Sequence, residues 1–312
     1  MAALIGCGLF SLLTTVSIIG ILIWESAHFF FDAGDESVET VGLFTEFLGG
    51  LTWNPMMGAD PVFGIWPLIT GTFKIVGVAM AFALPLGLIV GIWLSEYAAP
   101  RTRAVLKPML EILAGIPTVV FGFFALTFIT PLFKTLAANV LPFELNIGGF
   151  NALSAGLAVG IMCLPIVTSL SEDALRAVPG SLREGAYGLG SSRFEASVKV
   201  ILPAALSGIV AAFLLAIARA VGETMIVALA AGSAPDRLLT EDGGFNLAGL
   251  FAINEATQTM TGYMVMIFTG DVPYGTTKYY SAYAVAGTLF VITLLITLLG
   301  TWVRTRFRQA YG

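Results

Sequence analysis

The sequence predicts an all-α integral membrane protein with about six membrane-spanning helices. Of its 312 residues, 57% are hydrophobic and 11% are charged, whereas a soluble domain usually carries about 25% charged residues. The apolar residues fall in blocks of about 20 residues or more, which is the length that crosses a bilayer as a helix. Strands of a membrane barrel would alternate apolar and polar residues, and the blocks lack this alternation. Because lipid offers backbone amides no partners, each block is predicted to be helical.

Six blocks are predicted to span the membrane, and the first is interpreted as a retained anchor. Their ranges are 2–24, 65–94, 106–130, 153–170, 204–231 and 282–303. The first block has no basic region before it and is longer than the apolar core of a secretory signal. We therefore divide the chain into a first helix with an acidic outer loop, residues 1–61, and a transmembrane domain, residues 62–312.

The basic residues predict which side of the membrane each loop faces. Ten of the 15 lysines and arginines lie after the second block, after the fourth block or in the C-terminal tail. Cytoplasmic loops are the ones enriched in these residues. The opposite loops hold Lys134, Arg237 and Lys278. We therefore expect a multi-pass protein of the cytoplasmic (inner) membrane with both termini in the cytoplasm.

Several kinds of chemistry lack their sequence signals. The chain contains no Gly-Lys-Ser/Thr phosphate loop, no nucleophile elbow and no metal-binding cluster. Cys7 and Cys163 lie in apolar blocks and are predicted to be packing residues. No basic stripe with aromatic residues indicates nucleic acid. We therefore expect a chain that is not an enzyme and that binds neither a cofactor nor a metal.

The segment between the fourth and fifth blocks, residues 171–203, has the most informative pattern. Connections in helical bundles usually have 2–8 residues, and this one has about 30 with its own helix signals. Ser181 with Glu184, and Ser192 with Glu195, each match a capping box. We predict two short cytoplasmic helices joined by a glycine turn, stiff enough to transmit force.

This loop resembles the EAA loop of permease subunits in ABC-type importers. The family pattern is Glu-Ala-Ala-x3-Gly-x9-Ile-x-Leu-Pro, and the positions that match it are Glu184, Ala186, Gly190, Leu202 and Pro203. Gly185 replaces the middle alanine, which weakens a helix by up to about 1 kcal/mol, and Val200 replaces the isoleucine. The resemblance implies that these residues, Gly185 included, couple the chain to an ATPase subunit whose cleft receives the loop.

Further motifs make the chain similar to phosphate-transporter permeases of the PstC type. The likeness begins near Trp53 and continues to the C-terminus. Its motifs lie at 63–72, 85–87, 94–98, 106–108, 113–124, 219–225, 258–261 and 307–308. Glu223-Thr-Met225 favours this type over its sister permease, in which Ala-Pro is more usual after Glu-Thr. The resemblance implies a five-helix, type I (MetI-like) importer core and a permease subunit that moves inorganic phosphate.

The same resemblance implies partners. They are a homologous second permease of the PstA type, two ATPase subunits, an extracytoplasmic phosphate-binding protein and membrane lipid. The ATPase subunits are expected to hydrolyse the ATP. The long outer stretch 232–281 is expected to face the space where the binding protein docks, and the sequence leaves its structure open.

Three charged residues inside the predicted helices are candidate substrate-pathway residues. Arg219 and Glu223 are four residues apart, so a continuous helix would present them on one face. Arg219 would lie about 22 Å from the cytoplasmic end of its helix, inside a hydrocarbon core about 30 Å thick. Charges at this depth are costly and usually functional. Lys74 lies in the second block.

Each of these charges has two interpretations. Arg219 lends positive potential to a phosphate path, which suits its planar donor fork, while Glu223 balances it when the path is empty. Alternatively, the two form a buried ion pair that fixes helix packing. Lys74 either extends its ammonium group toward the interface or adds to the path.

Two further questions stay open. Gly115 and Pro117 in the third block, and Pro85 and Gly87 in the second, either unwind their helices around a cavity or serve packing. The alternative functions are an importer of another oxyanion or small solute, a membrane sensor or scaffold that contacts ATPases, and an intramembrane enzyme. The enzyme is the least favoured, because no nucleophile, base and metal set lies in the spans.

Overall fold

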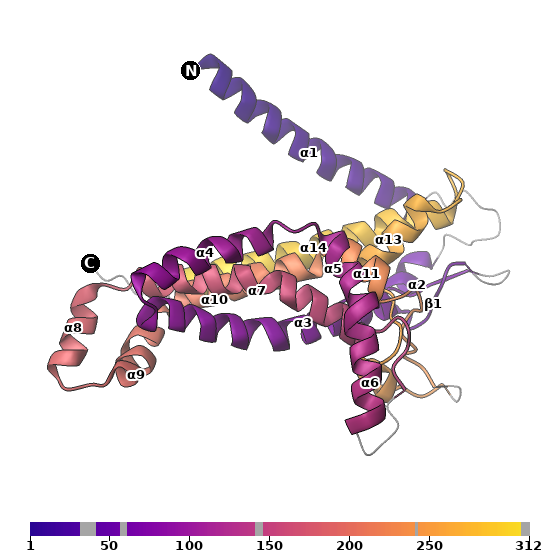
Figure 1. Ribbon diagram of the computed structural model, residues 1–312. Helices are drawn as coiled ribbons and strands as arrows, with labels where there is room; N and C mark the ends of the chain where they lie inside the picture. The colour runs from indigo at the N-terminus through magenta and orange to yellow at the C-terminus, as the bar shows by residue number, and fades with distance from the viewer. Residues whose placement is uncertain (32–41, 57–60, 141–145, 241–242, 307–312) are drawn as a thin grey trace. The chain divides into compact units, whose positions relative to one another are not determined.

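The computed structural model describes residues 1–31, 42–56, 61–140, 146–240 and 243–306 (Figure 1). Its internal contacts define two compact units. The first unit comprises Met1–Gly71, Ser233–Ala252 and Gln258–Val291, and the second comprises Thr72–Gly232, Ile253–Thr257 and Ile292–Gly312. The division at residue 61 expected from the sequence stays a prediction.

The described residues contain six helices that are long and apolar enough to cross a membrane, which confirms the predicted number. Their ranges are Leu4–Phe31, Trp66–Tyr97, Thr118–Asn139, Ala152–Arg176, Arg193–Val221 and Thr277–Val303. The third is displaced from the predicted 106–130, because the chain leaves the helical conformation just before Thr118. The protein is therefore a multi-pass membrane protein.

The first unit is organised around an aromatic core. Its elements are α1 (Ala2–Phe31), α2 (Leu43–Gly49), β1 (Trp53–Asn54), β2 (Val62–Phe63), α12 (Leu247–Phe251), α13 (Met260–Thr269) and the first half of α14 (Thr277–Arg306). The two strands pair antiparallel with Trp53 opposite Phe63. Phe47 and Tyr263 contact the Trp53 ring edge-to-face, a geometry that aromatic pairs favour. The hairpin is thus fixed by packing in addition to its short ladder.

The second unit contains the remaining elements. They are most of α3 (Trp66–Ile92), η1 (Trp93–Tyr97), α4 (Pro100–Ala114), α5 (Thr118–Phe124), η2 (Ala125–Ile129), α6 (Thr130–Val140), α7 (Ala152–Arg176), α8 (Gly180–Gly188), α9 (Arg193–Ala196), η3 (Ser197–Ile201), α10 (Leu202–Val221) and α11 (Met225–Ala230). The η elements are π-helical turns that continue neighbouring helices.

Helix α7 lies at the centre of the second unit, beside α3, α4 and α10 (Figure 1). Glycines let α3 and α7 approach closely. A Cβ atom at Gly87 would lie 2.6 Å from a Val167 methyl group, and one at Gly156 would lie 2.6 Å from Val78 Cβ. Pro85 lies within the continuous α3. Of the two interpretations left open for Pro85 and Gly87, the structure therefore favours packing over unwinding.

Two other helices of this unit are broken. Residues 115–117 separate α4 from α5, and residues 222–224 separate α10 from α11. The break at 115–117 matches the unwinding interpretation left open for Gly115 and Pro117, whereas the continuous helix predicted over 204–231 is wrong in this respect. Proline at 117 lacks an amide hydrogen and disfavours helix at the preceding residue. Beyond the breaks α5 and α11 pack together, and a Cβ atom at Gly122 would lie 2.8 Å from a Leu229 methyl group.

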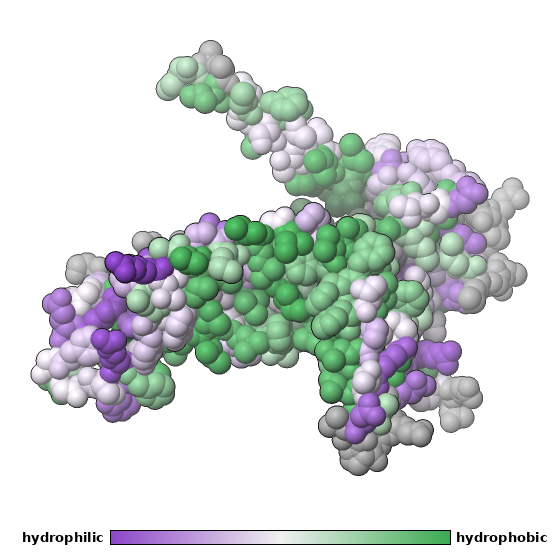
Figure 2. All heavy atoms as spheres, viewed as in Figure 1, coloured by the Kyte–Doolittle hydropathy of each residue, from purple (hydrophilic) through white to green (hydrophobic). Residues whose placement is uncertain are grey.

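The surface of the second unit matches this arrangement. Figure 2 shows hydrophobic residues covering the bundle of α3, α7 and α10, while hydrophilic residues gather at the end that carries α8 and α9. An apolar belt of helices with a polar loop at one end is the distribution expected of a membrane-spanning bundle.

Candidate functional site

The loop between α7 and α10 contains two helices, α8 and α9, joined by a turn at Gly190, as predicted. Helix α8 ends in a Schellman motif, in which Ser191 N–H donates to the Ala186 carbonyl (3.1 Å) and Gly190 N–H donates to that of Tyr187 (3.0 Å). Gly190 has φ +84°, a conformation that glycine adopts without steric cost. The spacing of the EAA-like pattern therefore places its glycine where the backbone requires one.

The two predicted capping boxes have different outcomes. At α9 the box is present, because Ser192 Oγ accepts from Glu195 N–H (3.3 Å) and Glu195 Oε2 accepts from Ser192 N–H (3.2 Å). At α8 the prediction is wrong. This helix begins one residue before Ser181, and its N-cap is Pro179, which has no side-chain cap. Helix α9 also continues through η3 into α10, so it is the first turn of a long helix.

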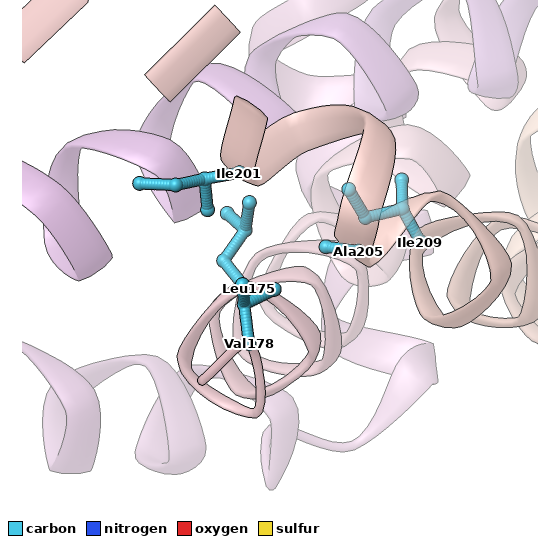
Figure 3. Close-up of a cluster of buried hydrophobic side chains, with 5 residues drawn as sticks. All are labelled: Leu175, Val178, Ile201, Ala205 and Ile209. Carbon is cyan, nitrogen blue, oxygen red and sulfur yellow. The ribbon is translucent and has the colours of Figure 1, made fainter. Parts of the chain in front are cut away.

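An apolar cluster fixes the base of the loop (Figure 3). Its buried members are Leu175, Val178, Ile201, Ala205 and Ile209, which come from the end of α7, the following turn, η3 and α10. Leu182 of α8 packs against the cluster. Burying a leucine, isoleucine or valine side chain of this cluster is worth about 1.5–3 kcal/mol relative to leaving it exposed. The loop is therefore held to the bundle along two helices.

The predicted coupling residues divide between the inside and the outside of the loop. Ala186 is buried, whereas Glu184 and Gly185 are exposed. Leu202 and Pro203 lie where the π-helical turn η3 passes into α10, inside the long helix. The tip exposes large apolar side chains, since Leu189 is 90% and Phe194 is 68% accessible. The tip thus has the composition of a docking surface.

The guanidinium group of Arg183 hydrogen-bonds α8 to η1 and to the end of α7. Arg183 Nη1 donates to the Val178 carbonyl (2.7 Å) and Nη2 to the Leu175 carbonyl (2.8 Å). The same group bonds to both carboxylate oxygens of Glu96 in η1, at 3.0 and 3.3 Å. In the sequence, Arg183 is one of the ten basic residues that predicted the orientation, and Glu96 had no predicted partner.

A buried carboxylate at the end of α7 is a second feature that sequence analysis missed. Glu172 has a side chain 1% exposed, and its oxygens accept from Arg103 Nε (2.7 Å) and Lys107 Nζ (2.9 Å) of α4. Arg176 lies 3.8 Å away on α7, and Lys107 also bonds to Asp173 (2.5 Å). The sequence shows basic residues near 103 and an acid at 172, but no local pattern pairs positions so far apart.

Lys107 shows the electrostatic consequence of this cluster. Burial opposes its charge, yet the hydrogen bonds to Asp173 and Glu172 outweigh burial and raise the pKa of Lys107 above its ordinary value. Sequence analysis did not anticipate these partners on α7. The ammonium group therefore remains charged throughout the physiological range.

Two of the candidate pathway residues, Arg219 and Glu223, lie at the break that follows the fifth membrane helix. Arg219 lies in the last turn of α10, and its Nη2 is 3.8 Å from Met162 Sδ of α7. Glu223 lies in the break itself with 7% of its surface exposed. Its Oε1 accepts from the backbone N–H groups of Met225 (3.1 Å) and Ile226 (3.3 Å). Because the helix is interrupted between them, the predicted shared face on one continuous helix is wrong.

Glu223 therefore has a local role that the sequence did not reveal. It caps α11, satisfying two of the amide hydrogens that a helix start leaves without intrahelical partners, and its charge suits a helix N-terminus. Irregular backbone at membrane depth occurs only where protein or a water-lined cavity surrounds it.

Lys74 lies in α3 with its side chain half-buried. Its two interpretations, and the pathway roles of all three residues, stay predictions.

These features define a class, the multi-spanning membrane protein with a structured loop between its fourth and fifth membrane helices. The chain belongs to the family of binding-protein-dependent transport system inner membrane components, whose model matches residues 83–309. This result confirms the family resemblance expected from the EAA-like loop. It also agrees with the interpretation of the chain as a transporter subunit.

Named relatives extend the comparison over most of the chain. The probable ABC transporter permease protein YqgH of Bacillus subtilis is 34% identical over 84% of this chain and 78% of its own. The phosphate transport system permease protein PstC of Mesorhizobium japonicum is 31% identical over 89% and 83%. The phosphate transport system permease protein PstA 1 of Mycobacterium tuberculosis is 33% identical over 63% and 59%.

Solved structures support the fold. A bacterial ABC transporter involved in the import of alginate aligns with a TM-score of 0.61 and 12% identity over 96% of both chains. The inward-facing MetNI methionine ABC transporter aligns with a TM-score of 0.54 and 18% identity over 78% of this chain and 98% of its own. The predicted type I, MetI-like core is thereby confirmed.

Proposed function

We propose that this chain is a permease subunit of an ATP-driven importer that moves inorganic phosphate across the cytoplasmic membrane. It provides one part of the transport path, and loop 171–203 couples it to ATPase subunits. It binds no cofactor itself, and the partner subunits hydrolyse the ATP. Both termini, together with α8 and α9, lie in the cytoplasm.

The observation that carries the coupling role is the geometry of the loop. Its tip presents Leu189 and Phe194 to solvent, while Arg183, Leu182 and the apolar cluster at its base hold it to the bundle. An exposed apolar tip on a firm base suits a surface that receives force from another protein.

The phosphate assignment rests on two supports. Relatives over most of the chain are named as phosphate permeases, and Arg219 lies beside a helix break. An arginine fork recognises phosphate through paired N–H donors. Glu223, Arg219 and Lys74 are the proposed pathway residues, with Glu223 also shaping the break as the cap of α11.

The proposed partners follow from the family and from the chain's own surface. A second permease of the PstA type would complete the path, two ATPases would drive it, and an extracytoplasmic phosphate-binding protein would deliver the solute. Lipid would cover the remaining apolar surface of the spans. The positive-inside distribution supports the orientation, because the loop with α8 and α9 is rich in arginine and lysine.

The test is uptake of radiolabelled phosphate into vesicles that hold the whole complex, with sulfate as competitor. Wild type should take up phosphate only with ATP, and a tenfold excess of sulfate should leave uptake within about a factor of two. Arg219→Ala should lower uptake at least tenfold, equivalent to about 1.4 kcal/mol in the barrier. Uptake blocked by sulfate would instead indicate a broader oxyanion importer. Normal uptake by Arg219→Ala would remove the arginine from the path.

A further inference from the structure

We infer that Arg183 is a positioning residue that transmits the movement of α8 to two membrane helices, α3 through η1 and α7 through its C-terminal end. The inference rests on the proposed coupling function. It assigns that function a specific transmitting group, which lies behind the docking surface.

The geometry joins three segments at one side chain. The guanidinium makes four hydrogen bonds, two to main-chain carbonyls of residues 175 and 178 and two to Glu96. Arg183 itself belongs to α8, Glu96 belongs to η1, and Leu175 lies in the last turn of α7. A movement of α8 therefore cannot occur independently of both helices while these bonds persist.

Each partner is held in place from its other side. Glu96 has a side chain 5% exposed, and Ser95 Oγ donates to its Oε1 at 2.8 Å. The Leu175 carbonyl, which also accepts from Val178 N–H (3.3 Å), lies at the negative end of the α7 helix dipole, so a cation suits it. Charged hydrogen bonds with fork geometry are directional and strong. The contact of Arg183 with Glu96 and the two carbonyls, called the joint below, is consequently well ordered, and its polar groups have hydrogen-bond partners.

The apolar contacts of α8 cannot replace this joint. Leu182 packs on the cluster formed by the end of α7, η3 and α10, and such contacts are non-directional. They keep α8 near the bundle but leave its orientation to the polar bonds. Without Arg183, α8 would still move with a bound ATPase subunit, but less of that movement would reach η1. Hydrolysis would then continue while transport fell.

The test compares hydrolysis with transport in the assembled importer. Arg183→Met removes the donors and keeps an unbranched side chain, and Glu96→Gln removes the charge with little change of shape. Arg101→Met is the control, because Arg101 is an exposed arginine of α4 outside the joint. Each complex is reconstituted in vesicles, its subunit content is measured, and phosphate uptake and ATP hydrolysis are recorded together.

Both joint variants should assemble and hydrolyse ATP within about twofold of wild type, while phosphate moved per ATP falls at least tenfold. The double variant should be no worse than Arg183→Met, since the two residues act through one contact. The Arg101→Met complex should keep the wild-type ratio. Arg183→Lys, which retains the charge without the fork, should fall between wild type and Arg183→Met.

An unchanged ratio in both variants would overturn the inference, whether the two rates stay normal or fall together. Loss of assembly in every variant, Arg183→Lys included, would also overturn it and assign the residue to folding alone. Failure of the proposed function looks different. In that case the wild-type complex itself would not move phosphate, and the ratio would be measured with the solute that it does move.

Discussion

At the residue scale, the environment of a charge decides its contribution more than its residue type does. Glu172 and Asp173 are adjacent acids, yet the first is 1% and the second 54% exposed. Glu172 bonds to Arg103 and Lys107 at short distances, whereas Asp173 shares one of these partners. The buried acid should therefore carry most of the stability at the contact between α4 and α7.

Replacing Glu172 by glutamine is expected to destabilise the protein by about 2 kcal/mol or more, because hydrogen bonds to charged groups contribute about 1.5–3 kcal/mol each. The measurement is thermal unfolding of the purified complex in detergent. Asp173→Asn is the matched control and should cost less than about 1 kcal/mol, as exposed ion pairs do. If the two variants lost equal free energy of unfolding, the buried Glu172 would not contribute more stability than the exposed Asp173.

The pathway charges show what the sequence can and cannot predict about a residue. Hydropathy alone placed Arg219 and Glu223 inside one membrane helix, whereas in the structure Arg219 lies in α10 and Glu223 lies in the break that follows it. Hydropathy did not reveal the break at residues 222–224, because Gly222 is compatible with either a continuous or an interrupted helix. The capping role of Glu223 depends on that break and was therefore invisible in the spacing.

At the element scale, the loop between α7 and α10 contains two glycines with opposite requirements. A Cβ atom at Gly185 or at Gly190 would meet no neighbouring atom within 4 Å. Gly185 lies inside α8, where glycine is a poor helix former, while Gly190 holds φ +84° in the turn. A side chain at either position would therefore clash with no neighbouring residue. The two positions differ only in backbone conformation, which is helical at Gly185 and left-handed at Gly190.

Gly185→Ala should therefore stabilise α8 by up to about 1 kcal/mol, whereas Gly190→Ala should destabilise the loop by about 1–2 kcal/mol. Hydrogen exchange of the amides in 180–190 would measure both effects, since local opening reports local stability. Slower exchange in Gly190→Ala would show that the turn tolerates a side chain and would remove the reason for a glycine there.

Local rules predicted some elements of this loop and missed others for identifiable reasons. The box at Ser192 formed as expected, but the identical pattern at Ser181 did not, because Pro179 already serves as the N-cap. Proline, too, had different outcomes at two positions. Pro117 precedes a new helix, while Pro85 lies in a continuous one where Gly87 packs against α7. Tertiary packing, which a single sequence does not display, decides between these outcomes.

At the scale of the whole molecule, composition fixed the number of spans, because every long apolar block has to be helical in lipid. The contacts that organise the end of the bundle near α8 were not predictable in the same way. Glu172 meets Arg103 and Lys107, and Arg183 meets Glu96, across large separations in sequence. Charge counting assigned these residues to one side of the membrane but could not pair them.

Under the proposed function, the exposed tip of the loop, Leu189 and Phe194, is the surface that contacts an ATPase subunit. Leu189 and Phe194 contribute little to the folded chain, since both are largely accessible to solvent, so their removal should leave its thermal stability unchanged. In the complex each would be buried, and burial of a large apolar side chain is worth about 1.5–3 kcal/mol. Leu189→Ser and Phe194→Ser are therefore expected to weaken ATPase binding at least tenfold, or about 1.4 kcal/mol.

Titration of the purified ATPase against the permease in nanodiscs would measure this binding directly. Phe194→Tyr is the matched control, because it keeps the ring and should bind within about threefold of wild type. If the serine variants bind normally, the tip does not dock, and the coupling surface must be sought elsewhere on the loop. If they bind weakly while Arg183→Met binds normally, docking and transmission are separate steps, carried by different faces of the same short helices.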